Sequence, residues 1–66
     1  MKHYIIETQE TPEAPKRPVT MQGKVRIFAS SSIAVRMARF VKMEFPGHIV
    51  HVVSREQQGP QEVIQI

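Results

Sequence analysis

"FASSSIAVRMARFVKMEFPGH", residues 28–48, contains the signals for one helix and for both of its ends. A serine at 30 or 31 is expected to cap a helix, with its hydroxyl accepting a hydrogen bond from an unpaired helical N–H. Pro46-Gly47 should end that helix, because proline cannot continue it and glycine suits a tight reversal. Between these signals apolar residues recur at i, i+3 and i+4, which makes one broad apolar face: Ile33, Ala34, Met37, Ala38, Phe40, Val41 and Phe45. The pattern therefore predicts one amphipathic helix over about 31–45.

Strand-like segments lie on both sides of this helix. "HYIIET" (3–8) alternates, with Tyr4 and Ile6 pointing to one side. "KVRIFA" (24–29) also alternates, and we expect Val25, Ile27 and Ala29 on its buried side and Lys24, Arg26 and Phe28 on the other. Two more strands are predicted at "HIVHVVS" (48–54) and "EVIQI" (62–66), with the polar turn "REQQGPQ" (55–61) between them.

The segment "QETPEAPKRPVTMQG" (9–23) contains three prolines in seven residues. Proline lacks the N–H that a β-ladder needs and holds its predecessor extended, so we expect a stiff loop or arm. The segment is longer than most connections in compact domains, and such loops are commonly functional.

These elements predict an α+β fold in a single domain, residues 1–66, with the order β–loop–β–α–β–β. One helix would pack on a small three- to four-stranded, largely antiparallel sheet. Because a helix joins them, strands 24–29 and 48–54 should point the same way through a right-handed crossover. The last strand could then return between them. A single helix covers one sheet face, so the other face is expected to stay partly open.

Composition restricts the class of protein. The 66 residues include no cysteine, which removes disulfides and thiolate metal sites and favours a reducing, cytoplasmic setting. No apolar run approaches the ~18 residues that a membrane-spanning helix needs. The N-terminal "MKHYIIETQE" turns polar too early for a signal peptide.

The residues that could carry chemistry are dispersed. His48 and His51 are three apart on a predicted strand, so they should project to opposite faces and cannot share one metal ion. The Ser30–Ser32 run lacks the glycines and lysine of a phosphate-binding loop. The carboxylates are spread over loops and termini, without the paired arrangement that acid–base catalysis needs. We therefore expect no enzyme activity, no catalytic residue, no metal and no cofactor.

Charge is concentrated in the middle of the chain. The overall net charge is +3, but residues 14–55 carry eight basic residues against Glu44 alone. At 100° per residue, the outward centre of the predicted helix falls on Arg36, Arg39 and Met43, flanked by Val35 and Lys42. A merely solvated face would more often mix acids with bases, whereas arginine and methionine are enriched at protein interfaces. The predicted partner-binding residues are Arg36, Arg39, Lys42 and Met43, with Lys16, Arg17 and Arg26 in support.

Residues 25–53, "VRIFASSSIAVRMARFVKMEFPGHIVHVV", resemble a pattern of small bacteriophage host-takeover proteins. The shared features are a strand, a short serine-containing link, a helix with alanines on its buried face, a Pro-Gly stop and a second strand. Positions that match are Val25, Ile27, Phe28, Ala29, Ala34, Met37, Ala38, Phe40, Pro46, Gly47 and Val50. The best-known members are the short podovirus-type inhibitors of host RNA polymerase. In those proteins the strand after the Pro-Gly carries the arginines, whereas here the helix does. The resemblance implies a phage protein that binds a host machine.

Three functions follow as hypotheses. The first is a non-catalytic protein that docks its basic helix face on an acidic surface of a host enzyme complex, such as RNA polymerase, and inhibits or modulates it. The second is a small DNA- or RNA-binding protein that places the same residues on phosphates. The third is a structural or self-associating subunit that pairs through the edge strand at 62–66 or the exposed sheet face. The chain would then be a monomer or a weak homodimer.

Overall fold

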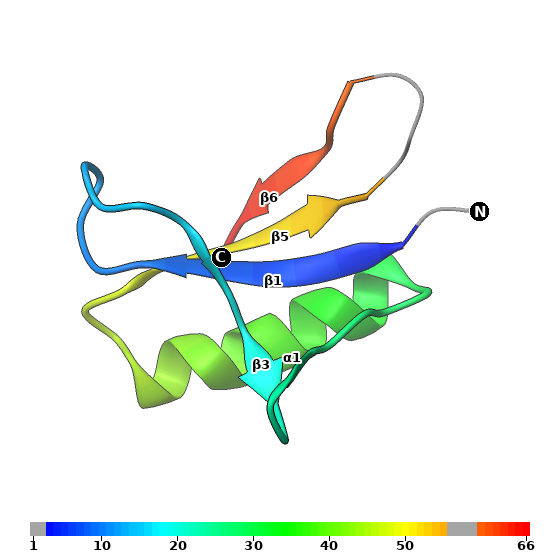
Figure 1. The fold of residues 1–66 in the computed structure, drawn as a ribbon, viewed down its shortest axis with the longest axis horizontal. Coiled ribbons are helices and arrows are strands. Elements are labelled where there is room, and N and C mark those ends of the chain that lie inside the picture. Colours follow the sequence, from blue (N-terminus) through cyan, green and yellow to red (C-terminus); the bar gives the residue numbers. More distant parts are fainter. Residues whose placement is uncertain (1–2, 56–59) are drawn as a thin grey trace.

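The structure is a computed structural model that describes residues 3–55 and 60–66. It confirms the α+β class: one helix packs on a four-stranded antiparallel sheet, and a small two-stranded ribbon lies beside them (Figure 1). The elements in chain order are β1 (Tyr4–Gln9), β2 (Arg17–Pro18), β3 (Thr20–Met21), β4 (Lys24–Val25), α1 (Ser31–Glu44), β5 (Ile49–Ser54) and β6 (Val63–Gln65). Of the predicted turn 55–61, residues 56–59 lie outside the described part of the chain.

The main sheet has the order β2-β1-β5-β6, and α1 lies across one of its faces. The central pair is β1 with β5, which stay in register over six residues from Tyr4 opposite Ser54 to Gln9 opposite Ile49. Because side chains alternate along a strand, every second residue of this pair faces the helix. The buried core between sheet and helix consists of Tyr4, Ile6, Phe28, Ala34, Ala38, Val50 and Val52.

The helix occupies almost the predicted range, but its buried line is narrower than the sequence suggests. Ala34 and Ala38 are 0% exposed, whereas Ile33 is 56% and Phe40 58% exposed. The two alanines have side chains short enough to let the helix backbone approach the sheet closely. Ile33 and Phe40 lie more than a quarter turn away from that line, so they fall outside the contact. The prediction that both belong to the buried face is therefore wrong.

The start of the helix also differs from the prediction. Ser30 is the N-cap residue, but its side chain makes no capping hydrogen bond. Its hydroxyl oxygen lies 2.8 Å from that of Ser32, so the two hydroxyls bond to each other. The backbone carbonyl of Ser30 accepts from the N–H of Ala34 at 3.1 Å and begins the helical ladder.

Strand 24–29 is shorter than predicted, and the side chain that it buries belongs to the side expected to face solvent. Only Lys24–Val25 form a strand, and Phe28 joins the main sheet through a single bridge to Tyr4, with two backbone hydrogen bonds of 2.8 Å. Phe28 is in the core, while Val25 and Ile27 are exposed. Alternation defines two faces without saying which one is buried, and the phenyl ring removes more apolar area from water than the smaller aliphatic side chains.

The predicted strand directions hold, but the predicted neighbour does not. Phe28 is antiparallel to β1, and β1 is antiparallel to β5, so the chain at Phe28 runs parallel to β5. The strand between them is β1, whereas β6 lies at the outer edge of the sheet beside β5. The six-residue pairing of β1 with β5 makes more ladder bonds than the three-residue β6 could, which accounts for the central place of β1.

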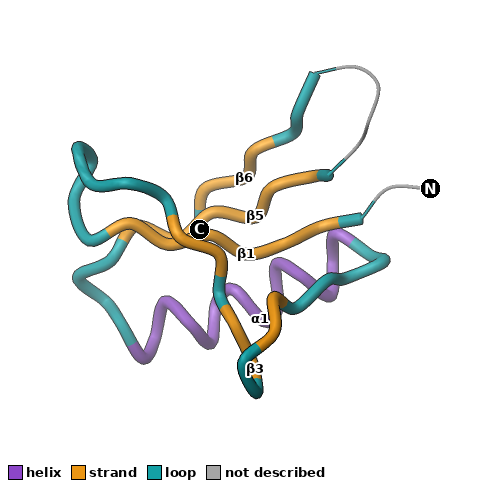
Figure 2. The backbone as a smooth tube through the Cα atoms, in the orientation of Figure 1, coloured by secondary structure: helices purple, strands orange, loops and turns teal. Residues whose placement is uncertain are grey.

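The proline-rich segment 9–23 is not a plain loop. It contains β2, which pairs with the end of β1, and β3, which forms a hairpin with β4 beside α1 (Figure 2). The hairpin turns through Gln22 and Gly23, with φ of 55° and 80°. Two positive φ values in a two-residue loop are the signature of a type I′ turn, whose twist matches that of antiparallel strands.

The sheet face away from the helix was expected to stay partly open. Its central residues are buried instead. Ile5, Gln9, His51 and Val53 are all at most 9% exposed. The Gln9 amide nitrogen donates to the carbonyl of Ala14 at 2.9 Å, and its oxygen lies 3.0 Å from Nε2 of His51. Since that amide oxygen can only accept, Nε2 of His51 must carry the proton. The pair fastens the start of the proline-rich segment to the sheet.

Candidate functional site

The outward side of α1 presents an unusual combination of side chains. Arg36 and Arg39 are exposed, and neither guanidinium forms an ion pair or hydrogen bond with any residue in the described ranges. Ile33, Phe40 and Met43 are exposed beside them, Met43 by 76%. We call these five residues the outer helix face. Positions three and four apart adjoin on a helix, so each arginine has an apolar neighbour: Phe40 and Ile33 for Arg36, Met43 for Arg39.

This face is both cationic and apolar, and the helix that carries it is firmly attached. Two turns of α1 are anchored on the sheet through Ala34 and Ala38. The helix bears one acidic residue, Glu44, at its C-terminal end. By helical spacing Glu44 lies toward the flank of α1 that faces the β3–β4 hairpin, away from Arg39. No acid therefore neutralises the two arginines within their own helix.

Lys42, predicted to belong to this face, instead makes a hydrogen bond within the chain. It is half-buried, and its ammonium donates to the backbone carbonyl of His48 at 2.6 Å. A cation in the last turn of a helix also interacts favourably with the helix dipole. We infer that Lys42 fixes the turn from α1 into β5, and we do not count it in the outer helix face.

The supporting basic residues lie on other elements. Lys16 and Arg17 are exposed in and beside β2, at the edge of the sheet next to β1. Arg26 follows β4, and its guanidinium carbon stands 5.6 Å from the centre of the Phe28 ring, a cation–π arrangement. No hydrogen bond, ion pair or ring contact joins these three residues to the outer helix face within the described ranges.

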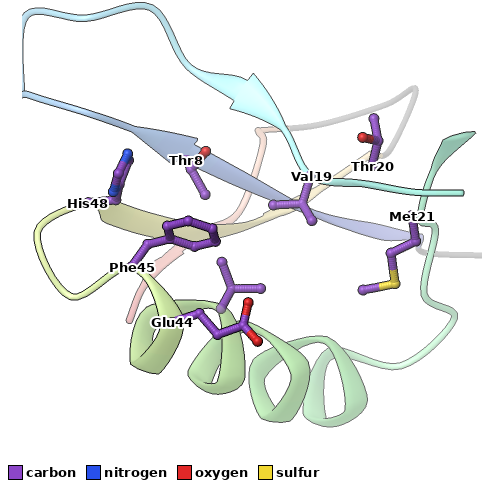
Figure 3. Close-up of a pocket in the computed structure, with 8 residues that line it drawn as sticks. Thr8, Val19, Thr20, Met21, Glu44, Phe45 and His48 are labelled. Atoms are coloured by element: carbon purple, nitrogen blue, oxygen red, sulfur yellow. The ribbon is translucent and has the colours of Figure 1, made fainter. Parts of the chain in front are cut away.

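A second feature is a groove between the β3–β4 hairpin and the end of α1 (Figure 3). Its volume is ≈ 350 Å³, and its walls are mainly apolar. The lining residues are Thr8, Val19, Thr20, Met21, Val41, Glu44, Phe45 and His48. This groove was not predicted from the sequence, because one of its walls is the hairpin. The signal that could have found it is "MQGK", a two-residue loop ending in glycine between strand-forming residues.

The two central histidines lie on opposite sides of the sheet, as predicted. His48 lines the groove beside the helix and makes an edge-on contact with Phe45, with ring centres 5.4 Å apart. His51 bonds Gln9 on the other face, and its Nδ1 has no partner in the described structure. Within residues 3–55 and 60–66, no group of three or more His, Cys, Asp or Glu side chains is placed to hold a metal ion. The same ranges contain no helix that is long and apolar enough to cross a membrane.

Comparison with known proteins finds no match to this chain among protein-family models, curated proteins or solved structures.

Proposed function

We propose that this protein is a non-catalytic binding protein that docks the outer helix face on an acidic surface of a larger protein. The observation that carries the proposal is the pair Arg36 and Arg39, exposed and without an ion pair among the described residues, with Phe40 and Met43 exposed next to them. A carboxylate on the partner would give each guanidinium the bidentate contact that it lacks here.

The apolar neighbours favour a protein over a nucleic acid as the partner. A phosphate-binding surface needs cations along one track and gains little from exposed aliphatic side chains. Nucleic-acid sites that use aromatic rings stack bases on them, and on the outer helix face Phe40 is the one ring available. Protein interfaces, in contrast, combine arginine with methionine and aromatic residues at their centres.

The resemblance of residues 25–53 to phage host-takeover proteins supports a bacterial enzyme complex as the partner class. RNA polymerase and other nucleic-acid machinery are the first candidates, because the proteins that this segment resembles act on RNA polymerase and a basic face fits an acidic partner surface. Docking would inhibit or modulate the complex by covering part of its surface. The chain would work in the cytoplasm of the host cell.

Capture from a bacterial lysate tests this proposal when it is made with matched variants. Wild type is compared with Arg36→Glu/Arg39→Glu and with Lys16→Glu/Arg17→Glu, which makes the same change of charge on β2. We expect one dominant protein that the helix variant fails to retain and the β2 variant retains. Equal loss in both variants would show that overall charge, rather than the outer helix face, determines binding.

The nucleic-acid alternative has its own test. Generic double-stranded DNA and single-stranded RNA are titrated in an electrophoretic shift assay at physiological salt. The proposal predicts no shift with either. A shift that disappears in Arg36→Ala/Arg39→Ala would assign the same face to phosphates and overturn the protein-docking function.

A further inference from the structure

The two edge strands of the main sheet, β2 and β6, differ in their content of proline and charged residues. At the β2 edge, "PKRP" (15–18) brings two prolines and two cations, which are the usual protections against pairing with another strand. At the β6 edge, "VIQI" (63–66) contains no charge and no proline. Val63, Ile64 and Gln65 are all exposed, and no described strand lies on the outer side of β6 (Figure 1).

The register of β6 shows which of its backbone groups have no partner among residues 3–55 and 60–66. Ser54 donates its N–H to the carbonyl of Glu62, and Ile66 donates to Val50, both at 2.9 Å. In an antiparallel ladder bonding residues alternate, so residues 62, 64 and 66 direct their backbone groups toward β5. The N–H and C=O groups of Val63 and Gln65 therefore point outward from the sheet.

We propose that β6 pairs antiparallel with β6 of a second copy of this chain, about a twofold axis at Ile64. The spacing is self-complementary, because Val63 and Gln65 are equidistant from Ile64. Val63 of each copy would exchange both backbone hydrogen bonds with Gln65 of the other, which uses all four outward groups of each strand. The two Ile64 side chains would meet directly across the axis, where antiparallel pairs approach most closely.

The observations select a second copy over an open chain of subunits. Head-to-tail growth would require β6 to pair with β2, whose prolines and cations oppose it. Pairing between two β6 strands is isologous and closes after two subunits. The result is a continuous sheet of eight strands. Because the axis is perpendicular to that sheet, both copies of α1 lie on the same side of it, and the dimer presents two outer helix faces in one direction.

The interface is small, so the association should be weak and dependent on concentration. We expect analytical ultracentrifugation to show a mass that rises from one chain toward two as the protein concentration increases. In the same samples, amide hydrogen exchange at Val63 and Gln65 should slow with concentration. Exchange at Ile64, already bonded to β5, should not follow this pattern.

Val63→Pro is the sharpest variant, because it deletes an outward N–H and leaves the bonds to β5 in place. Each dimer loses two of four hydrogen bonds, so the dissociation constant should rise roughly thirtyfold. Gln65→Lys, which adds a charge to the edge without altering the backbone, should also weaken pairing. It replaces Val63→Pro as the test if the proline variant does not fold. Thr11→Lys adds the same charge on an exposed residue of the proline-rich segment and should leave pairing unchanged.

A mass of one chain at all concentrations up to about a millimolar, the weak end of specific association, would overturn the proposal. A dimer that Val63→Pro and Gln65→Lys leave unaltered would also overturn it, since the contact would then lie elsewhere. Both outcomes are independent of the capture experiment, because the dimer forms from this chain alone and the docking partner binds α1.

Discussion

Ala34 and Ala38 set how closely α1 approaches the sheet. Both are completely buried, and the core on the sheet side is formed by Ile6, Val50 and Val52. These two methyl groups lie at the closest contact between helix and sheet, and Val35, Met37 and Val41 of the same helix pack against the core as partly buried side chains. Larger apolar residues of the same helix, such as Phe40, contribute to its surface and little to the core.

Enlarging one of these alanines should destabilise the fold more than removing an exposed aromatic ring. Ala38→Leu inserts three carbons into a filled contact and should lower the free energy of unfolding by about 1–3 kcal/mol. Phe40→Ala should change it by no more than about 0.5 kcal/mol, because the ring lies largely in solvent. Urea denaturation of both variants measures the difference, and the reverse order would mean that the helix is packed through Phe40.

The Gln9 side chain adds hydrogen bonds that hold the start of the proline-rich segment against the sheet, beside the backbone pairing of β2 with β1. Gln9→Ala removes the bonds to Ala14 and Pro12 and leaves the buried His51 without its acceptor. The expected cost is about 1–3 kcal/mol, the penalty of an unsatisfied buried polar group. Limited proteolysis should cut within 10–16 faster than in wild type. Thr11→Ala, an exposed change in the same segment, should leave the cleavage rate as it is.

The hairpin formed by β3 and β4 is the element that most alters the surface beside α1. It builds one wall of the groove, and its turn requires a left-handed backbone at two successive residues. Asparagine followed by glycine is the commonest solution for such a turn, and here glutamine takes the first place. Gln22 therefore holds a conformation that side chains other than asparagine and aspartate adopt with some strain.

Gly23 and Gly47 form a matched pair for testing the turn. Gly23 has φ of 80°, so Gly23→Ala should destabilise the hairpin by about 1 kcal/mol through backbone strain alone. A Cβ at either glycine would meet no atom within 4 Å. Gly47→Ala, where no left-handed backbone is required, should be neutral within about 0.5 kcal/mol. Thermal unfolding of the two variants separates backbone strain from crowding, and equal effects would contradict the type I′ turn.

The helix and the long strands could be read from the sequence because their signals are local. Spacing, the Pro-Gly stop and β-branched runs predicted α1, β1 and β5 to within one or two residues. The hairpin was missed because Thr20–Met21 follows three prolines and was assigned with them to the loop 9–23, so the predicted strand at 24–29 had no partner before it. The burial of Phe28 could not be predicted from local sequence, since it depends on the bridge to Tyr4, a residue far away in the sequence.

The molecule as a whole presents two exposed surfaces of different chemistry, the β6 edge of the sheet and the outer helix face. The sheet edge at β6 is uncharged and offers backbone groups, whereas the outer helix face offers guanidinium groups and apolar side chains. Sequence reasoning found the arginines from helical periodicity. It could not find their apolar neighbours Ile33 and Phe40, because it had assigned both to the core.

Docking through the outer helix face is tested by measuring, with calorimetry, how tightly the captured partner binds three variants of this chain. These are Phe40→Ser, Arg39→Ala and the control Lys16→Ala. Since truncating a central contact commonly costs about 2 kcal/mol or more, the first two variants should each bind about tenfold or more weakly at unchanged stability. The control should bind like wild type. Unchanged affinity in both Phe40→Ser and Arg39→Ala would contradict docking through the outer helix face.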